Sequence, residues 1–222
     1  MRVDTHVHLK PFSKSSDFTL EAYAKLAAAQ GCKVITVTDY GSAKAAPELE
    51  KRLGGTMVVY GAELATHEGN FLVYGADRKF MLGLPARLRT LDELERSAKL
   101  AVVWAHPRIP WRNGWRAPFP RQPLTKFIFA HVDGVEFYNG AMLAMAARGG
   151  VECKYHDELR AQIEKWNVAA LGGSGCQTAD GFLSAWTSFP RLRTPQDFVT
   201  AIKDRAVKPG AVVGKPKLQV VT

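Results

Sequence analysis

Lys33-Val34-Ile35-Thr36-Val37-Thr38 is a run rich in β-branched residues, which is typical of a buried β-strand. The segment before it, Thr19–Gln30, has helical spacing, and Gly31 stands where such a helix would end. The same alternation continues along the chain, with strands expected at 2–6, 57–64, 70–75, 101–105, 134–138 and 168–171 and helices at 42–53, 90–99, 155–166 and 195–205. Alternating strands and helices predict an α/β fold with a parallel sheet and outer helices, either open or closed as a barrel.

The expected helix at 90–99 carries a start signal, because Thr90 and Glu93 match a capping box. No internal repeat, low-complexity tract or linker divides the 222 residues. This length suits one large α/β unit. We therefore expect a single domain over residues 1–222.

One segment departs from the alternating pattern. Residues 107–126 are rich in proline, contain Trp111 and Trp115, and carry five basic and no acidic side chains. A long loop inside a compact domain is usually functional or disordered. We expect an Arg/Trp/Pro-rich insertion here.

Composition and charge limit the setting and the partners. The three cysteines, Cys32, Cys153 and Cys176, are scattered without a Cys-x-x-Cys pair, which is typical of a reducing compartment. The first residues hold no apolar signal core, and no apolar run approaches the roughly 18 residues that span a bilayer. We expect a cytoplasmic protein with no membrane partner. The net charge of +9 suits a phosphate-containing small molecule or nucleic acid, or simply aids solubility, and the oligomeric state stays open.

Candidate metal ligands stand at the carboxyl ends of expected strands. His6 and His8 form a His-x-His pair, whose imidazoles point the same way in an extended segment. Glu63 comes near the end of its strand, and His106 directly follows another. In α/β folds, binding and catalytic groups gather at that end of the sheet. Imidazoles with a carboxylate suit zinc, manganese or iron, so we expect one shared site rather than four unrelated surface or capping residues.

An ordered series of short motifs covers nearly the whole chain: Asp4-Thr5-His6-Val7-His8, Ser16-Asp17-Phe18-Thr19, Val37-Thr38-Asp39-Tyr40, Gly61-Ala62-Glu63, Gly69 to Gly75, Ala105-His106-Pro107, Val135 to Gly140 and Gly173 to Gln177. Each motif is weak alone, but the series resembles the PHP (polymerase and histidinol phosphatase) domain family. The resemblance implies a distorted (β/α)7, TIM-like barrel with up to three metals at its C-terminal face, used to hydrolyse phosphate esters.

The resemblance also assigns residues. His6, His8, Glu63 and His106 match ligands of the family. Four other positions depart from its ligand pattern: Tyr40, Asn70, Gly175 and Gln177. Tyr, Asn and Gln are poor ligands for a borderline metal, and Gly has no side chain. We therefore expect a degenerate, reduced site with one or two divalent transition metals.

Four further residues lie close in sequence to ligand positions or to vacated ones and are candidates for additional metal or site residues: Asp17, Asp39, His67 and Cys176. Their ordinary interpretations stay open. His67 suits an ordinary loop histidine, and Cys176 suits a small buried thiol.

Two functions fit these observations, and the sequence identifies no catalytic residue for either. The first is a metal-dependent phosphoesterase, in which Arg108, Arg112 and Arg116 bind substrate phosphate. The alternative is a non-catalytic PHP-fold protein that binds a phosphate-containing ligand, nucleic acid or a protein partner. The segment 107–126 also suits a packing or oligomer surface, because Trp and Arg are typical interface anchors.

Overall fold

The computed structural model describes residues 1–107, 122–149 and 155–212. Its elements are β1 (Arg2–Val3), α1 (Leu20–Ala29), β2 (Val34–Val37), α2 (Ala45–Arg52), β3 (Met57–Thr66), β4 (Gly69–Gly75), α3 (Arg78–Leu82), η1 (Leu91–Glu93), β5 (Leu100–Trp104), α4 (Gln122–His131), β6 (Gly134–Asn139), α5 (Gly140–Gly149), α6 (Tyr155–Trp166), β7 (Ala169–Gly173), η2 (Ala179–Gly181), β8 (Ala185–Ser188), α7 (Pro195–Lys203) and β9 (Lys208–Ala211). Within these ranges no helix combines the length and apolar character needed to span a membrane.

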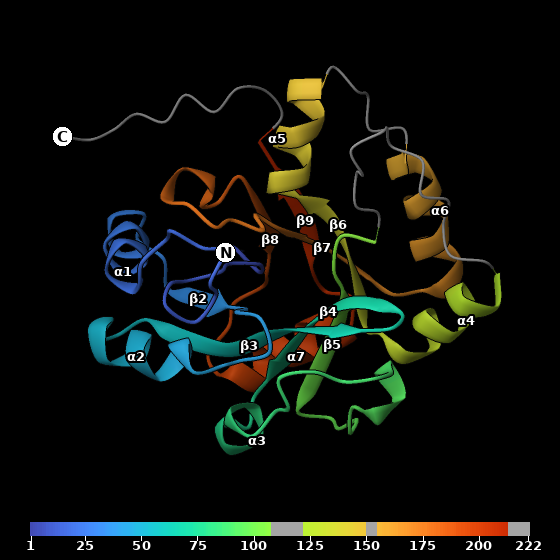
Figure 1. The fold of residues 1–222 in the computed structure, drawn as a ribbon, viewed down its shortest axis with the longest axis horizontal. Helices are drawn as coiled ribbons and strands as arrows, with labels where there is room; N and C mark the ends of the chain where they lie inside the picture. Colours follow the sequence, from blue (N-terminus) through green and yellow to red (C-terminus); the bar gives the residue numbers. More distant parts are fainter. Residues whose placement is uncertain (108–121, 150–154, 213–222) are drawn as a thin grey trace.

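The main sheet has six strands in the order β2-β3-β4-β5-β6-β7, and Figure 1 shows that it curls, with α1, α2, α4 and α6 around it. The pairs β2–β3, β5–β6 and β6–β7 are parallel, whereas β4 runs antiparallel to both neighbours. The sheet is therefore mixed: a parallel sheet was expected, and β4 departs from it. The turn between Thr66 and Gly69 is too short for a crossover, so β4 must return as a hairpin.

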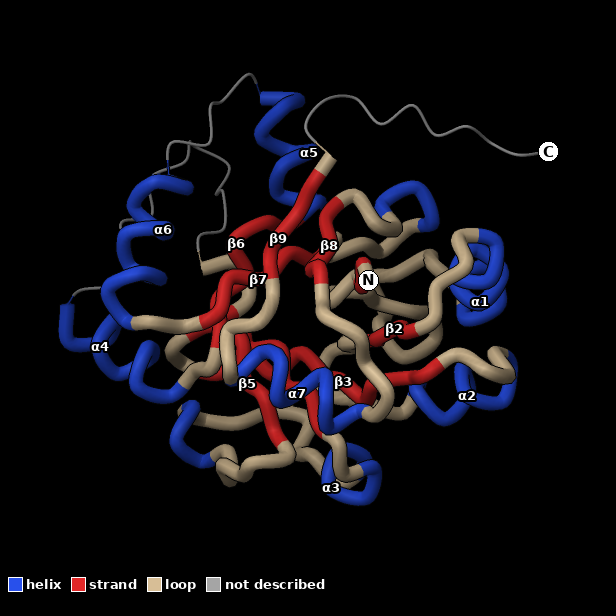
Figure 2. The backbone as a smooth tube through the Cα atoms, turned by 180° about the vertical axis from the view of Figure 1, so that it is seen from behind, coloured by secondary structure: helices blue, strands red, loops and turns tan. Residues whose placement is uncertain are grey.

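Residues 6–8 connect the two edges of the curled sheet. The Gly175 N–H donates to the His6 carbonyl (2.8 Å), and the His8 N–H donates to the Cys176 carbonyl (3.0 Å), just beyond β7. On the other side the Thr38 N–H donates to the Val7 carbonyl (2.8 Å), just beyond β2. The His-x-His segment is thus held by backbone hydrogen bonds on both sides. A second sheet has the strand order β1-β8-β9, and Figure 2 shows β8 and β9 next to β7.

Alternate residues of the curled strands face two different cores. In β3 to β5, Val59, Leu72 and Val103 pack in one core with Phe198 and Ile202 of α7. The intervening strand residues instead join the core that lies against α1 and α2. This period of two matches strand geometry, because successive side chains point to opposite faces. Side chains of α7 therefore fill part of the face of the curled sheet that Val59, Leu72 and Val103 line.

The structure differs from two further sequence expectations and adds two strands that were not expected. The helix expected at 90–99 is only the short η1 turn: Thr90 makes no side-chain cap, and Glu93 Oε2 accepts from the Arg89 N–H (2.8 Å) instead. Buried Leu94 already has extended backbone. Within the expected insertion at 107–126, residues 122–126 belong to α4, and residues 108–121 lie outside the described ranges. The strands β8 and β9 were not predicted, since both are short and β9 contains Pro and Gly.

Candidate metal centre

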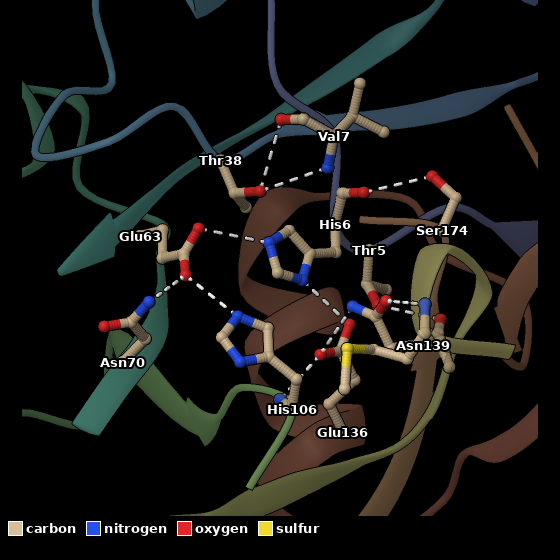
Figure 3. Close-up of polar contacts among 12 residues, drawn as sticks. Thr5, His6, Val7, Thr38, Glu63, Asn70, His106, Glu136, Asn139 and Ser174 are labelled. Atoms are coloured by element: carbon tan, nitrogen blue, oxygen red, sulfur yellow. Dashed lines mark hydrogen bonds and ion pairs between the residues drawn. The ribbon is translucent and has the colours of Figure 1, made fainter. Parts of the chain in front are cut away.

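The side chains of the candidate centre come from four neighbouring segments at one edge of the sheet. His6 and His8 follow β1, Glu63 lies near the end of β3, and His106 follows β5. Asn70 joins them because β4 is antiparallel, so its first residues lie beside the last residues of β3. Figure 3 shows Glu63 between His6 and His106, with one carboxylate oxygen directed to each.

The ligand atoms of this cluster lie close together. His6 Nε2 is 3.0 Å from His8 Nε2 and 3.2 Å from Glu63 Oε2, and His8 Nε2 is 3.1 Å from the same oxygen. His106 Nε2 is 3.1 Å from Glu63 Oε1. The side chains of His6, His8 and Glu63 are 1–2% exposed, and that of His106 is 15% exposed. Solvent therefore reaches the cluster at His106.

Glu136 fixes the orientation of His6. Its Oε1 is 2.8 Å from His6 Nδ1, and its Oε2 accepts from the His106 N–H (2.8 Å) and from Asn139 Nδ2 (3.1 Å). A carboxylate that accepts from Nδ1–H leaves the lone pair of neutral His6 on Nε2, which faces the cluster. Gly173 makes this packing possible, since a Cβ there would lie 2.5 Å from the Cβ of His6.

His8 has its own chain of hydrogen bonds. Ser13 Oγ donates to Asp39 Oδ1 (2.7 Å), so it accepts from His8 Nδ1 (3.2 Å). The Leu9 N–H donates to the same Asp39 oxygen (2.6 Å). Asp39 Oδ2 is buried with no hydrogen-bond partner among the described residues. Burial raises the pKa of Asp39 to about 7, although the bonds from Leu9 and Ser13 lower it. The chain leaves the Nε2 lone pair of His8 facing the cluster.

Electrostatics favours a positive charge at the centre of the cluster. Burial would lower the pKa of His6, but the charges of Glu136 and Glu63 hold it well above its usual value. Burial would raise the pKa of Glu63, but the charge of His6 and the hydrogen bonds from the imidazoles hold this pKa well below its usual value. Burial lowers the pKa of His8. A proton on His6 supplies this charge, and a divalent cation would replace it.

The donor set fits a borderline divalent ion, which takes imidazole nitrogen and carboxylate oxygen. His6 Nε2, His8 Nε2 and Glu63 Oε2 form a triangle with edges of 3.0, 3.1 and 3.2 Å. Tetrahedral ligands at about 2.0–2.1 Å from zinc stand roughly 3.3 Å apart, so small adjustments suffice. Ligand atoms of His6, Glu63 and His106 also lie within 4.8 Å of one another. The residues present therefore fit a metal.

His106 and Asn70 lie beside Oε1 of Glu63, the carboxylate oxygen that faces away from His8. Asn70 Nδ2 donates to Glu63 Oε1 (2.7 Å), the oxygen that also faces His106. His106 has a φ of 27°, an uncommon backbone conformation for a residue other than glycine. Strained residues of this kind are held by their surroundings, here by the bond from the His106 N–H to Glu136.

Of the four additional candidates from the sequence, three have side chains that lie away from the cluster and one is connected to it through a hydrogen bond. The Asp17 side chain is 84% exposed and pairs with Lys10, so it points away from the cluster. His67 is exposed in the β3–β4 turn. Cys176 belongs to the apolar core, where burial raises its pKa well above the usual value. Only Asp39 connects to the cluster, through Ser13. Arg108, Arg112 and Arg116 lie outside the described residues.

Glu136 was missed as a site residue. Sequence reasoning treated it only as part of a motif in an apolar strand. The available signal was its position, because an acid between Val135 and Phe137 in a buried strand must find a partner. Its partner, His6, is distant in sequence, and only the fold reveals it.

The positions that depart from the family pattern also lie around the cluster. The ring of Tyr40 stacks on His8, with centroids 4.3 Å apart, and Gln177 Nε2 donates to the Tyr40 hydroxyl (3.2 Å). Burial raises the pKa of Tyr40, and the charge of Glu63 adds to this effect. At Gly175, which has a φ of 59°, a Cβ would lie 2.6 Å from Asn139 Nδ2. Asn139 therefore occupies the space beside residue 175.

Comparisons with known proteins bear on the fold. No protein-family model and no curated protein matches the sequence. The structure of PsfC from Pseudomonas syringae is similar with a TM-score of 0.64 at 17% identity, over 95% of this chain and 91% of PsfC. A Bifidobacterium adolescentis protein, named by inference as a metal-dependent phosphoesterase, is similar with a TM-score of 0.58 at 15% identity, over 91% of this chain and 96% of that protein. At these identities the likeness shows the fold alone: this chain shares a mixed α/β fold with both proteins, and its candidate metal cluster lies at one edge of the curled sheet.

Proposed function

We propose that this chain is a PHP-like metal-dependent phosphoesterase with a reduced metal site. The proposal takes the curled sheet, together with the bridging residues 6–8, as a distorted seven-stranded barrel. One observation carries the function: three ligand atoms from His6, His8 and Glu63 meet at 3.0–3.2 Å. Both imidazoles are oriented by acceptors on their far nitrogens, which is how proteins prepare histidines for a metal.

A divalent metal bound there would supply a Lewis acid for a phosphoryl oxygen and an acidified water as nucleophile. The residues of the chain perform the remaining tasks. His6, His8 and Glu63 hold the ion, and Glu136 keeps His6 in the tautomer that binds it. His106, the most exposed of the four candidate ligands, lies where a substrate would arrive. The surrounding burial excludes bulk water from the other three.

We expect one or two ions of zinc, manganese or iron per chain. The Oε2 side of Glu63 offers two imidazoles to one ion. Among the described residues, the Oε1 side offers His106 alone, and the Asn70 amide already donates to that oxygen. An amide donor competes with a metal for the same lone pairs. The Oε2 side is therefore the primary site, and any second ion binds more weakly.

The substrate class is a phosphate ester. The +9 charge supports an anionic substrate, and Arg108, Arg112 and Arg116 remain predicted substrate contacts. A cytoplasmic location also remains a prediction. The name of the Bifidobacterium adolescentis protein supports the same reaction class.

A reconstitution experiment tests the proposal. Protein treated with a chelator is reloaded with manganese, zinc or iron, its metal content is measured, and p-nitrophenyl phosphate and bis-p-nitrophenyl phosphate are offered as substrates. We expect at least one ion per chain and hydrolysis that requires it. Glu63→Gln should lose both, because the amide removes the charge that faces the imidazoles. Glu50→Gln, at an exposed ion pair with Arg78, is the matched control.

Two results would count against the proposal in different ways. A protein that binds no metal after reconstitution would show that the cluster is only a buried polar network. A protein that binds metal and phosphate but hydrolyses neither ester would favour the alternative, a non-catalytic protein that binds a phosphate-containing ligand.

A further inference from the structure

Tyr40 and Gln177 lie next to the cluster although they come from distant parts of the chain. Gln177 Nε2 donates to the Tyr40 hydroxyl (3.2 Å), and the ring of Tyr40 lies on the imidazole of His8 at 4.3 Å between centroids and 23° between planes. Tyr40 is 45% exposed, whereas His8 is 1% exposed. The pair therefore forms a solvent-facing surface directly beside a metal-ligand candidate.

The backbones of both residues are firmly held. The Tyr40 backbone forms a parallel bridge with Glu63. The Gln177 carbonyl accepts from the N–H groups of Asp17 and Phe18 at 2.9 and 3.0 Å. Because the backbones are fixed, the two side chains present their polar atoms in a defined place. Binding groups held in this way lose little entropy when a ligand arrives.

The hydrogen bonds of the Tyr40 oxygen leave its proton available. A phenol hydroxyl accepts hydrogen bonds and donates one. In the bond with Gln177 the Tyr40 oxygen is the acceptor, because the amide Nε2 donates to it. That bond does not use the phenol proton, so the hydroxyl can donate its own O–H to a ligand. Gln177 likewise keeps a second amide N–H. The surface offers neutral donors, which suit the oxygens of a tetrahedral oxyanion.

We infer that Tyr40 and Gln177 form a substrate-positioning subsite that donates hydrogen bonds to a non-bridging oxygen of the phosphoryl group. The inference rests on the proposed function, because the oxyanion is placed by the metal at the neighbouring cluster. In this role the two residues position the substrate rather than hold the ion. Stacking also fixes the ring of His8, so the subsite and the metal ligand share one orientation.

The test measures the binding of inorganic phosphate to the metal-loaded protein by titration calorimetry, with metal affinity measured in parallel. Tyr40→Phe keeps the ring on His8 and removes only the hydroxyl. It should weaken phosphate binding about tenfold and leave metal affinity unchanged, since a hydrogen bond to a charged group is lost. Gln177→Glu should weaken phosphate binding further, because a carboxylate repels the anion. Tyr60→Phe is the matched control, as its hydroxyl bonds to Glu50 in a different part of the surface.

Each outcome decides a separate point. Phosphate affinity unchanged in Tyr40→Phe, with normal binding to the wild type, would overturn the inference and leave the proposed function intact. A fall in metal affinity equal to the fall in phosphate affinity would also overturn it, since Tyr40 would then act through His8. A wild-type protein that takes up metal but binds no phosphate would overturn both.

Discussion

Glu136→Gln should weaken metal binding through a change of tautomer at His6. The Glu136 carboxylate accepts three hydrogen bonds while nearly fully buried, from His6 Nδ1, the His106 N–H and Asn139 Nδ2. Glutamine has the same shape but replaces one oxygen with an NH₂ group. At the Oε2 position that group would face two donors. It must therefore take the Oε1 position, opposite His6 Nδ1.

The consequence for His6 follows from its hydrogen bonds. An amide N–H at 2.8 Å from Nδ1 requires a lone pair on that nitrogen, so the imidazole proton moves to Nε2. A protonated Nε2 cannot bind a metal. Loss of such an orienting partner usually costs 10- to 100-fold in metal affinity. In Glu136→Gln the amide enforces the tautomer that cannot bind a metal. We therefore expect the upper end of this range, a loss of about 100-fold in metal affinity, or about 2.7 kcal/mol of binding free energy.

Competition with a chromophoric chelator measures this affinity for zinc and manganese, and circular dichroism checks the fold. Glu50→Gln is again the matched control, because it makes the same substitution at an exposed ion pair. The reasoning is refuted if folded Glu136→Gln protein binds metal within about twofold of wild type, since His6 would then not depend on this carboxylate.

Three further predictions concern the same cluster and the basic segment. His8→Ala should reduce bound metal in elemental analysis, because it removes one corner of the ligand triangle, and unchanged content would exclude His8 as a ligand. The next prediction concerns protein kept metal-free by a chelator. The pKa of His6 is raised, and that of Asp39 is raised to about 7, so both groups stabilise the fold at low pH and lose this contribution as pH rises. The Tm of metal-free protein should therefore fall as pH rises from about 4, near the ordinary pKa of an aspartate, to about 7, and Asp39→Asn should flatten the fall, whereas an equal slope would contradict the assignment. The double change Arg112→Ala and Arg116→Ala should weaken phosphate binding at low salt, where such contacts are strongest, and unaltered binding would remove these arginines from the site.

Sequence patterns anticipated the parts of the structure that depend on short-range regularities. Strand ends placed His6, His8, Glu63 and His106 together because alternation and sheet direction bring such ends to one edge. The helix at 90–99 was wrong because a local capping signal lost to tertiary packing, which draws Leu94 into the core as extended chain. Contacts between distant residues leave no short-range signal.

The positions that depart from the ligand pattern of the PHP domains that the sequence resembles illustrate this limit. Tyr40 and Gln177 bond to each other, and the absent side chain at Gly175 makes room for Asn139, whose amide donates to Glu136. A side chain restored at residue 175 alone would displace Asn139 and disturb the carboxylate that orients His6. Each of these residues fits a neighbour that contacts the candidate ligand cluster, which agrees with the smaller metal site proposed above.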